Sequence, residues 1–252
     1  MAVEPALYPS LEGKSVIITG GASGIGAHIV RAYADQGAKV AVIDIDAASG
    51  TALAARLGEA VRFYQADLLE VENFDALVAQ ISADQGAPQI LVNNAAHDQR
   101  HKIGETSVSD WDWSLAVNLR HVFFMAQSVI PLMQAQGGGA IVNLSSITAL
   151  NGSPDLPAYS AAKGAIITLT KTLACKFGGD GIRCNAVAPG AVVTPRQAAL
   201  WVSPERQKDF IARQPLHEPV TESDIANAVL FLSSDAARMI TKQVLVVDGG
   251  LH

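Results

Sequence analysis

The stretch Thr19-Gly-Gly-Ala-Ser-Gly-Ile-Gly26 decides the fold of this chain. It directly follows an apolar run at 15–19 and opens a segment of helical periodicity at 24–36. Glycines let the backbone approach a pyrophosphate closely, and the start of a helix supplies unpaired N–H groups with a partial positive charge. Glycines also occur in ordinary tight turns, but the position between a strand and a helix favours a dinucleotide-binding turn. We therefore expect a bound dinucleotide to contact Gly20, Ser23, Gly24, Ile25 and Gly26.

The alternation of strand and helix in that first unit continues along the chain. Short apolar and β-branched runs predict strands at 15–19, 39–44, 61–65, 90–93, 140–144, 182–187 and 244–247. Helical periodicity predicts helices at 24–36, 47–57, 71–84, 111–135, 157–177 and 222–233. This pattern is typical of the α/β class: a Rossmann-type, doubly wound, parallel seven-stranded sheet in a single domain of residues 1–252. The stretch 194–220 is rich in Pro, Arg and Gln, and we expect it to be an irregular substrate lid.

The composition excludes several classes of protein. Apolar residues make up 49% of the 252 residues and charged ones 17%, which is enough to bury a large core. The net charge of −6, without a cluster of Lys and Arg, argues against binding to nucleic acid. Residues 1–14 lack the pattern of a signal peptide, and no apolar run reaches the roughly 18 residues that span a membrane. We expect a soluble, cytoplasmic protein in which Cys175 and Cys184 act as small apolar residues, with no metal site.

An acidic residue ends the second expected strand. Asp44 lies 24 residues after Gly20, where a carboxylate bonds both hydroxyls of the adenosine ribose in dinucleotide-binding folds. It would repel a 2′-phosphate, and no Arg or Lys lies next to it, so NAD is favoured over NADP. A helix N-cap or a surface acid is an alternative role for Asp44. Asp67 could similarly accept from the adenine amino group or be a solvated loop carboxylate.

A second constellation carries the chemistry. Tyr159 and Lys163 are four residues apart in a helical pattern, so the phenol and the ammonium project from the same face. A nearby positive charge favours the ionised form of a phenol and makes it a usable general base. Ser146 follows the fifth expected strand, at the edge of the sheet where ligands bind, and its hydroxyl could hold a reacting oxygen. Each feature alone is common in surface helices and turns, whereas their order downstream of a dinucleotide turn is specific.

Together these motifs resemble the short-chain dehydrogenase/reductase family, over essentially the whole chain. The matching pieces are the glycine turn at Thr19, Asp67, N-N-A-A at Asn93, Asn118 in A-V-N-L-R, Ser146, Tyr159, Lys163, P-G-A-V-V-T at Pro189 and the terminal D-G-G. The segment N-N-A-A has Ala where the family usually has Gly, and we expect only a local adjustment there. Ser145 is an alternative to Ser146, whose spacing to Tyr159 matches the family better.

The resemblance implies roles for these residues. Tyr159 would be the proton donor or acceptor, Lys163 would orient the nicotinamide ribose and lower the pKa of the phenol, and Ser146 would bind the substrate oxygen. Asn118 would anchor a water in the proton relay. The further cofactor contacts implied are Asp67, at the adenine, Val192 and Thr194, at the carboxamide, and Leu68, Asn94, Ala95, Pro189 and Gly190. The family also implies a homotetramer, with helices 111–135 and 157–177 between subunits. We expect four aromatic residues of the first of these helices to pack against a neighbouring subunit rather than to touch ligand: Trp111, Trp113, Phe123 and Phe124.

Two polar segments bear on the substrate. The loop after the fourth expected strand reads His97-Asp-Gln-Arg-His-Lys102, and the lid offers Arg196, Gln197, Trp201, Arg213 and Gln214. Such groups suit the hydroxyls of a sugar and suit a sterol poorly, although the charged loop could simply be solvated.

The chain also resembles the bacterial aldose 1-dehydrogenases of the family. The matching segments are Y-P-S-L-E-G-K near the start, N-A-A-H-D-Q-R-H-K in the loop, N-L-R-H at Asn118 and T-P-R-Q at Thr194. That resemblance implies NAD-dependent oxidation of a sugar at the anomeric carbon to the lactone. Asp98, Arg100, His101, Ser146, Arg196 and Gln197 would then bind the sugar. The alternatives are a reductase of a 3-oxoacyl thioester or other small ketone, which Asp44 and the negative charge disfavour, and a non-catalytic NAD-binding regulator, which should have a damaged triad.

Overall fold

A computed structural model describes residues 6–252 of the chain. The sheet contains β1 (Ser15–Thr19), β2 (Lys39–Asp44), β3 (Val61–Gln65), β4 (Ile90–Asn93), β5 (Gly139–Leu144), β6 (Ile182–Pro189) and β7 (Val244–Val247). All neighbouring strands are parallel, in the order β3-β2-β1-β4-β5-β6-β7. The expected doubly wound seven-stranded sheet is confirmed. Residues 1–5, part of the segment expected to contain no signal peptide, lie outside the described residues.

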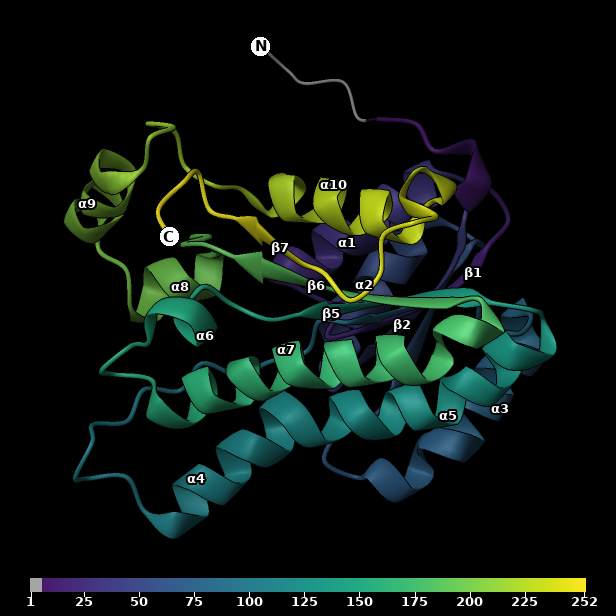
Figure 1. Ribbon diagram of the computed structural model, residues 1–252, viewed down its shortest axis with the longest axis horizontal. Coiled ribbons are helices and arrows are strands. Elements are labelled where there is room, and N and C mark those ends of the chain that lie inside the picture. Colours follow the sequence, from purple (N-terminus) through teal and green to yellow (C-terminus); the bar gives the residue numbers. More distant parts are fainter. Residues whose placement is uncertain (1–5) are drawn as a thin grey trace.

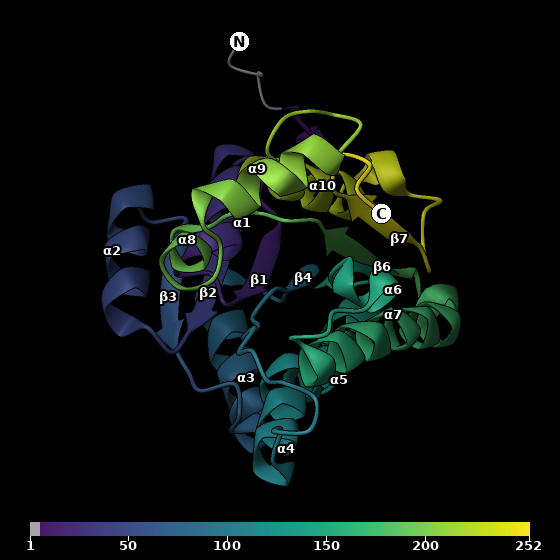
Figure 2. The ribbon, with the colours of Figure 1, turned by 90° about the vertical axis from the view of Figure 1, so that its left-hand side faces the viewer.

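Helices cover both faces of this sheet (Figure 1). One face carries α1 (Gly24–Asp35), α2 (Ala47–Leu57) and α10 (Glu222–Ser233), and α1 packs along α10. The other carries α3 (Phe74–Gln85), α4 (Val108–Leu115), α5 (His121–Ala135) and α7 (Pro157–Phe177). Three further helices, α6 (Thr148–Asn151), α8 (Pro195–Leu200) and α9 (Pro204–Arg213), lie together at the edge where the strands end (Figures 1 and 2). Strand order reverses between β1 and β4 at this edge, and open α/β sheets bind ligands at such a point.

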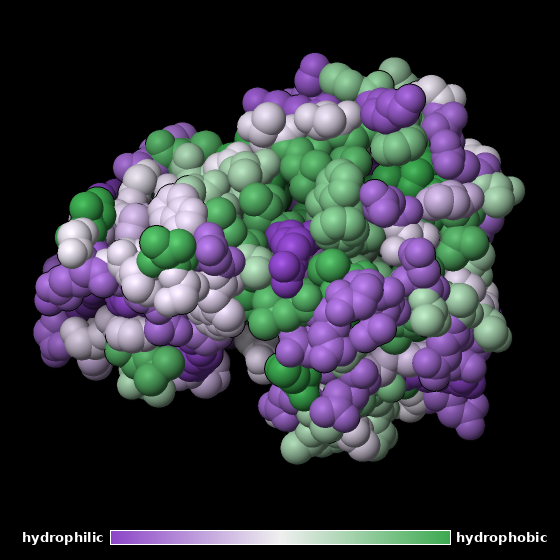
Figure 3. Space-filling view, turned by 90° about the horizontal axis from the view of Figure 1, so that it is seen from below, coloured by the Kyte–Doolittle hydropathy of each residue, from purple (hydrophilic) through white to green (hydrophobic). Residues whose placement is uncertain are grey.

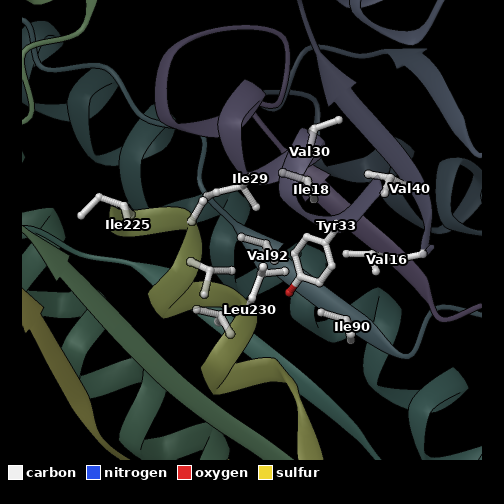
Figure 4. Close-up of a cluster of buried hydrophobic side chains, with 14 of the residues drawn as sticks. Val16, Ile18, Ile29, Val30, Tyr33, Val40, Ile90, Val92, Ile225 and Leu230 are labelled. Atoms are coloured by element: carbon white, nitrogen blue, oxygen red, sulfur yellow. The ribbon is translucent and has the colours of Figure 1, made fainter. Parts of the chain in front are cut away.

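The core consists of two clusters, one on each side of the sheet. Val16 and Ile18 of β1 point to the cluster that α1 and α10 cover, whereas Ile17 points to the cluster under α3, α5 and α7. Figure 4 shows Tyr33 of α1 among the aliphatic side chains of the first cluster. Its hydroxyl is 2.6 Å from Ser233 Oγ on α10, so the one polar group of this side chain is satisfied where it is buried.

Four expected elements differ in the structure. The helix expected at 111–135 begins at Val108, where Ser107 and Asp110 form a capping box, and a π-helical turn at Ala116–Arg120 separates α4 from α5. β5 begins one residue earlier than expected, at Gly139, and β6 extends to Pro189. The stretch 194–220 was wrongly expected to be irregular: it contains α8 and α9. Thr194 and Ser203 each cap a helix and are followed by Pro at its first position, a start signal that the polar composition obscured.

The segment Val108–Ala135 is long and apolar enough to cross a membrane by length and composition, which the sequence pattern did not predict. In the structure its second half packs on the sheet: Met125, Val129 and Met133 are fully buried in the second core cluster. It is therefore a core helix of a soluble protein.

Candidate active site

The glycine turn forms a cradle that no larger residue fits. A Cβ on Gly26 would lie 2.0 Å from Gly20 O and 2.6 Å from Asn94 Nδ2, and Gly24 adopts the left-handed φ of +51°. Asn94 holds the turn by donating to Gly20 O (2.8 Å) and Thr19 O (3.1 Å). Ser23 is the N-cap residue of α1, and its side chain makes no capping bond to the helix. The exposed backbone at the start of α1 therefore fits the pyrophosphate of a dinucleotide.

Asp44 lies beside this cradle at the end of β2. Its Oδ2 accepts from Ala22 N (3.0 Å) and its Oδ1 from Asp46 N (3.1 Å). The N-cap of α2 is Asp46, which accepts from Ser49 N, so the alternative role of Asp44 as a helix cap is wrong. The structure places the carboxylate of Asp44 next to the phosphate cradle, where ribose hydroxyls could donate to it and where a further phosphate would be repelled.

The ends of β3 and β4 supply the rest of the expected cofactor groove. Asp67 Oδ1 accepts from Leu69 N (2.9 Å), which fixes the loop, and Leu68 packs against the second core cluster. Thr19 Oγ1 accepts from Asn94 N (3.1 Å) and Ala95 N (3.2 Å), and this ties the ends of β1 and β4 together. A Cβ on Gly20 would lie only 2.6 Å from Ala95 Cα, so the two loops are in close contact where the sheet reverses.

Ser146, Tyr159 and Lys163 come together at the end of β5 and the start of α7. Ser146 and Tyr159 line the same cavity, and Lys163 lies beneath them with its Nζ donating to Leu144 O (2.7 Å) and 5.5 Å from the centroid of the Tyr159 ring. Ser145 donates its hydroxyl to Lys163 O (2.8 Å) and is nearly fully buried. This bond holds α7 against the strand end and leaves Ser146 as the serine that faces the cavity.

Burial has the largest effect on the pKa values of Tyr159 and Lys163. Burial raises the pKa of Tyr159, the Asp98 carboxylate raises it further, and the nearby Ser146 hydroxyl lowers it. That Lys163 lowers this pKa stays a prediction. Burial also lowers the pKa of Lys163 to about 7, because the ammonium loses its hydration in the core.

The π-helical turn positions Asn118. Its Oδ1 accepts from His97 N (2.8 Å), and its Nδ2 donates to His97 O (3.0 Å) and Ser114 O (2.9 Å). Asn118 thereby fixes the start of the loop after β4, and π-turns often occur at functional sites. One turn later, His121 is fully buried beside Ala95 O (3.2 Å from Nε2), and burial lowers its pKa to about 3, with Lys163 adding to the effect.

The loop after β4 and the lid are joined through Asp98. Arg196 Nη1 lies 2.5 Å from Asp98 Oδ1, and Gln197 Nε2 donates to Asp98 Oδ2 at 2.5 Å. Arg196 also contacts His97 Nε2 at 3.1 Å; burial and Arg196 lower the pKa of His97, which suits the neutral, accepting form of the ring. We call this set, Asp98 with Arg196 and Gln197, the lid latch. Residues 98 positions apart are thus brought together over the active site.

The cavity under the lid has a volume of about 370 Å³, within the range of small-molecule sites. Of the expected substrate residues, Asp98, Arg100, Ser146 and Gln197 line it. His101 instead faces Asp110 (3.8 Å), and Arg196, which pairs with Asp98, is not among the lining residues. Among the expected cofactor residues, Gly190 and Val192 also reach this lining, and Thr194 packs against Gly24.

Several lining residues were not predicted. The segment around α6 contributes Ile147, Thr148, Asn151 and Leu156. The lid contributes Val202, Arg206 and Phe210, and the last residues of the chain contribute Leu251. Arg213, which the lid was expected to offer, also lines the cavity, and its spacing to Arg206 and Phe210 places all three on one helical face. Gln214, expected to face the pocket, donates instead to Leu216 O and Glu218 O and fixes the turn after α9. Within residues 6–252 no three His, Cys, Asp or Glu side chains form a metal site.

Comparison with known proteins identifies the family. The model of the enoyl-(acyl carrier protein) reductase family matches residues 20–252. The chain is 47% identical over 255 residues to a probable galactose dehydrogenase of Rhizobium meliloti, covering 100% of each chain. It is 41% identical over 248 residues to D-xylose 1-dehydrogenase of Caulobacter vibrioides, covering 97% of this chain and 98% of that protein.

A solved structure also matches this chain over nearly its whole length. A short-chain dehydrogenase/reductase from Brucella melitensis, described as a glucose/ribitol dehydrogenase, matches with a TM-score of 0.90 at 27% identity, and 98% of this chain and 99% of that one are covered. The fold, the intact Ser146, Tyr159 and Lys163 group and these similarities agree. The chain therefore belongs to the short-chain dehydrogenase/reductase family, oxidoreductases that act on CH–OH groups with NAD(P).

Proposed function

We propose that this enzyme oxidises an aldose at its anomeric carbon to the lactone, with NAD as cofactor. The observation that carries the proposal is the cavity that Ser146 and Tyr159 share with Asp98 and Gln197. The phenol and the serine hydroxyl suit a C1 hydroxyl, and the carboxylate and amide groups suit the remaining hydroxyls of a sugar. The similarity to galactose and xylose dehydrogenases supports this class of substrate.

The residues of this chain have defined tasks in the reaction. Bound NAD supplies the acceptor for the hydride that leaves the anomeric carbon. Ser146 Oγ donates to the substrate oxygen and orients it, and Tyr159 Oη takes the proton of the C1 hydroxyl as general base. Lys163 Nζ lies 5.5 Å from the centroid of the phenol ring, and its protonated form would stabilise the phenolate that the proton transfer needs. Asn118 keeps the loop after β4 in place and anchors a water of the proton relay.

The proposal of NAD rather than NADP rests on Asp44. Its carboxylate lies next to the phosphate cradle and accepts two backbone N–H groups. In the described part of the chain it makes no ion pair with Lys or Arg, so nothing nearby would neutralise a 2′-phosphate. The ribose hydroxyls of NAD would donate to the Asp44 carboxylate, which its bonds to Ala22 N and Asp46 N already hold in position.

The test is NADH formation at 340 nm with a panel of aldoses, polyols, secondary alcohols and 3-oxoacyl thioesters, with NAD and NADP compared side by side. We expect turnover of at least one aldose, with kcat/KM roughly 100-fold higher for NAD than for NADP. Accumulation of the lactone, detected by its alkaline hydrolysis to the acid, would establish C1 as the site of oxidation. Activity confined to ketones or thioesters would contradict the aldose proposal while leaving the family assignment intact.

The lid latch predicts a shift in the pH dependence of the reaction. Because the carboxylate of Asp98 raises the pKa of Tyr159, Asp98→Asn should lower that pKa. The phenolate is the active base in oxidation, so the rising limb of kcat/KM against pH should move to lower pH. Gln197→Ala is the matched control, because it removes the other hydrogen bond of the latch without a change in charge. An unmoved limb in Asp98→Asn, or an equal shift in Gln197→Ala, would rule out the charge of Asp98 as the cause.

We also propose that the enzyme is a homotetramer of the cytoplasm. Figure 3 shows the face below the sheet, with hydrophobic side chains gathered at its centre and hydrophilic ones around them. Trp111 of α4 is 39% exposed and Phe123 of α5 is 42% exposed, which is costly for large apolar side chains without a partner. Cys175 is exposed and both described cysteines are free, as suits a reducing compartment.

A further inference from the structure

One face of α9 carries two arginines into the active-site cavity. Arg206, Phe210 and Arg213 are spaced at i, i+4 and i+7, so they lie along one side of the helix, and all three line the cavity that contains Ser146 and Tyr159. The Arg206 guanidinium lies over the Phe210 ring, 5.8 Å from its centroid, and this contact orients it along the cavity wall.

The charges of these two arginines are not compensated, unlike the other charges of the cavity. Asp98 is bound by Arg196, and Arg100 lies 3.6 Å from Asp155 and over the ring of Trp201. Arg206 and Arg213, by contrast, make no ion pair with any carboxylate of residues 6–252.

A carboxylate on the same helix could have formed an ion pair with either arginine. Asp209 is three residues from Arg206 and four from Arg213, the spacings at which ion pairs form on a helix. It does not line the cavity, and neither pair forms. Two solvent-exposed guanidinium groups without a carboxylate partner therefore border one cavity of a protein whose net charge is −6.

We propose that the substrate is an aldose with an anionic group, a carboxylate or a phosphate monoester, which Arg206 and Arg213 bind. This inference rests on the proposed aldose oxidation. Because the C1 hydroxyl would react at Ser146 and Tyr159, the anionic group would be on another carbon of the sugar. Guanidinium groups bind both anions through paired N–H donors, and a carboxylate and a phosphate monoester differ in charge and size.

The experiment compares D-galactose with D-galacturonate and D-galactose 6-phosphate, three probes that differ only at C6. For the native enzyme with NAD we expect kcat/KM to be about 100-fold higher for one of the two anionic probes than for galactose, mainly through KM. In the double variant Arg206→Gln/Arg213→Gln that ratio should fall to near one. Salt should raise KM for the anionic probe and leave KM for galactose unchanged, because screening weakens exposed charge pairs.

Lys208→Gln is the matched control. Lys208 lies on the same helix, is exposed and does not line the cavity, so the substitution removes one charge from α9 without altering the wall. The ratio should stay as in the native enzyme. A preference for carboxylate over phosphate, or the reverse, decides which anion the site takes.

The two proposals fail in different ways. If kcat/KM for galactose equals that for both anionic probes, or if the double variant keeps the native ratio, the anionic substrate is excluded and aldose oxidation stands. If no aldose is oxidised, neutral or anionic, while other alcohols or ketones are turned over, the proposed function itself is wrong.

Discussion

Tyr159→Phe is expected to lower kcat/KM for aldose oxidation by about 10³-fold, the contribution of a positioned general base. The substitution removes one oxygen from a side chain that lines the cavity together with Ser146. Without that oxygen no group at this position can take the C1 proton. The measurement is steady-state NADH formation, with NAD binding followed separately by titration calorimetry, and the affinity for NAD should change little.

A second tyrosine provides the control for this result. Tyr64 on β3 donates its hydroxyl to Asp84 (2.9 Å) and belongs to the core under α3, away from the cavity. Tyr64→Phe removes the same atom from the same kind of residue and should keep kcat/KM within about twofold. If Tyr159→Phe retained more than about a tenth of the native rate, Tyr159 would not be the base.

Gly26→Ala is expected to weaken NAD binding by roughly 100-fold or more, because we expect the glycine turn to hold the pyrophosphate. The added Cβ would lie 2.0 Å from Gly20 O and 2.6 Å from Asn94 Nδ2. The turn therefore has to open, and the hydrogen bond that Asn94 Nδ2 donates to Gly20 O has to break. Overpacking of this kind also lowers the free energy of unfolding, by about 1–3 kcal/mol. Calorimetric titration with NAD and a thermal melt measure the two effects.

Gly164→Ala separates a local clash from a general effect of replacing glycine. Gly164 lies within α7, and a Cβ there would meet nothing within 4 Å. Alanine is favoured over glycine inside a helix, so this variant should be more stable by about 0.5–1 kcal/mol and should bind NAD as the native protein does. Equal affinity for NAD in Gly26→Ala and the native protein would contradict the cradle as the phosphate site.

Much of the fold was predictable because it depends on local pattern. Each strand of the sheet is a short apolar run between turn residues, and every expected strand is present within two residues of its expected ends. The ends of helices were harder to predict. The π-helical turn at Ala116–Arg120 leaves no mark in the apolar periodicity, and the caps Thr194 and Ser203 begin helices that a polar composition had suggested were irregular.

The sequence by itself determined the glycine turn, the acid at the end of β2 and the pairing of Tyr159 with Lys163. Each depends on residues close along the chain, whose geometry follows from the period of a strand or helix. Only the tertiary structure decided that Asp98 binds Arg196 and Gln197, and that burial raises the pKa of Tyr159. Contacts between distant loops have no period in the sequence, and a pKa depends on how completely the folded chain excludes water from the group.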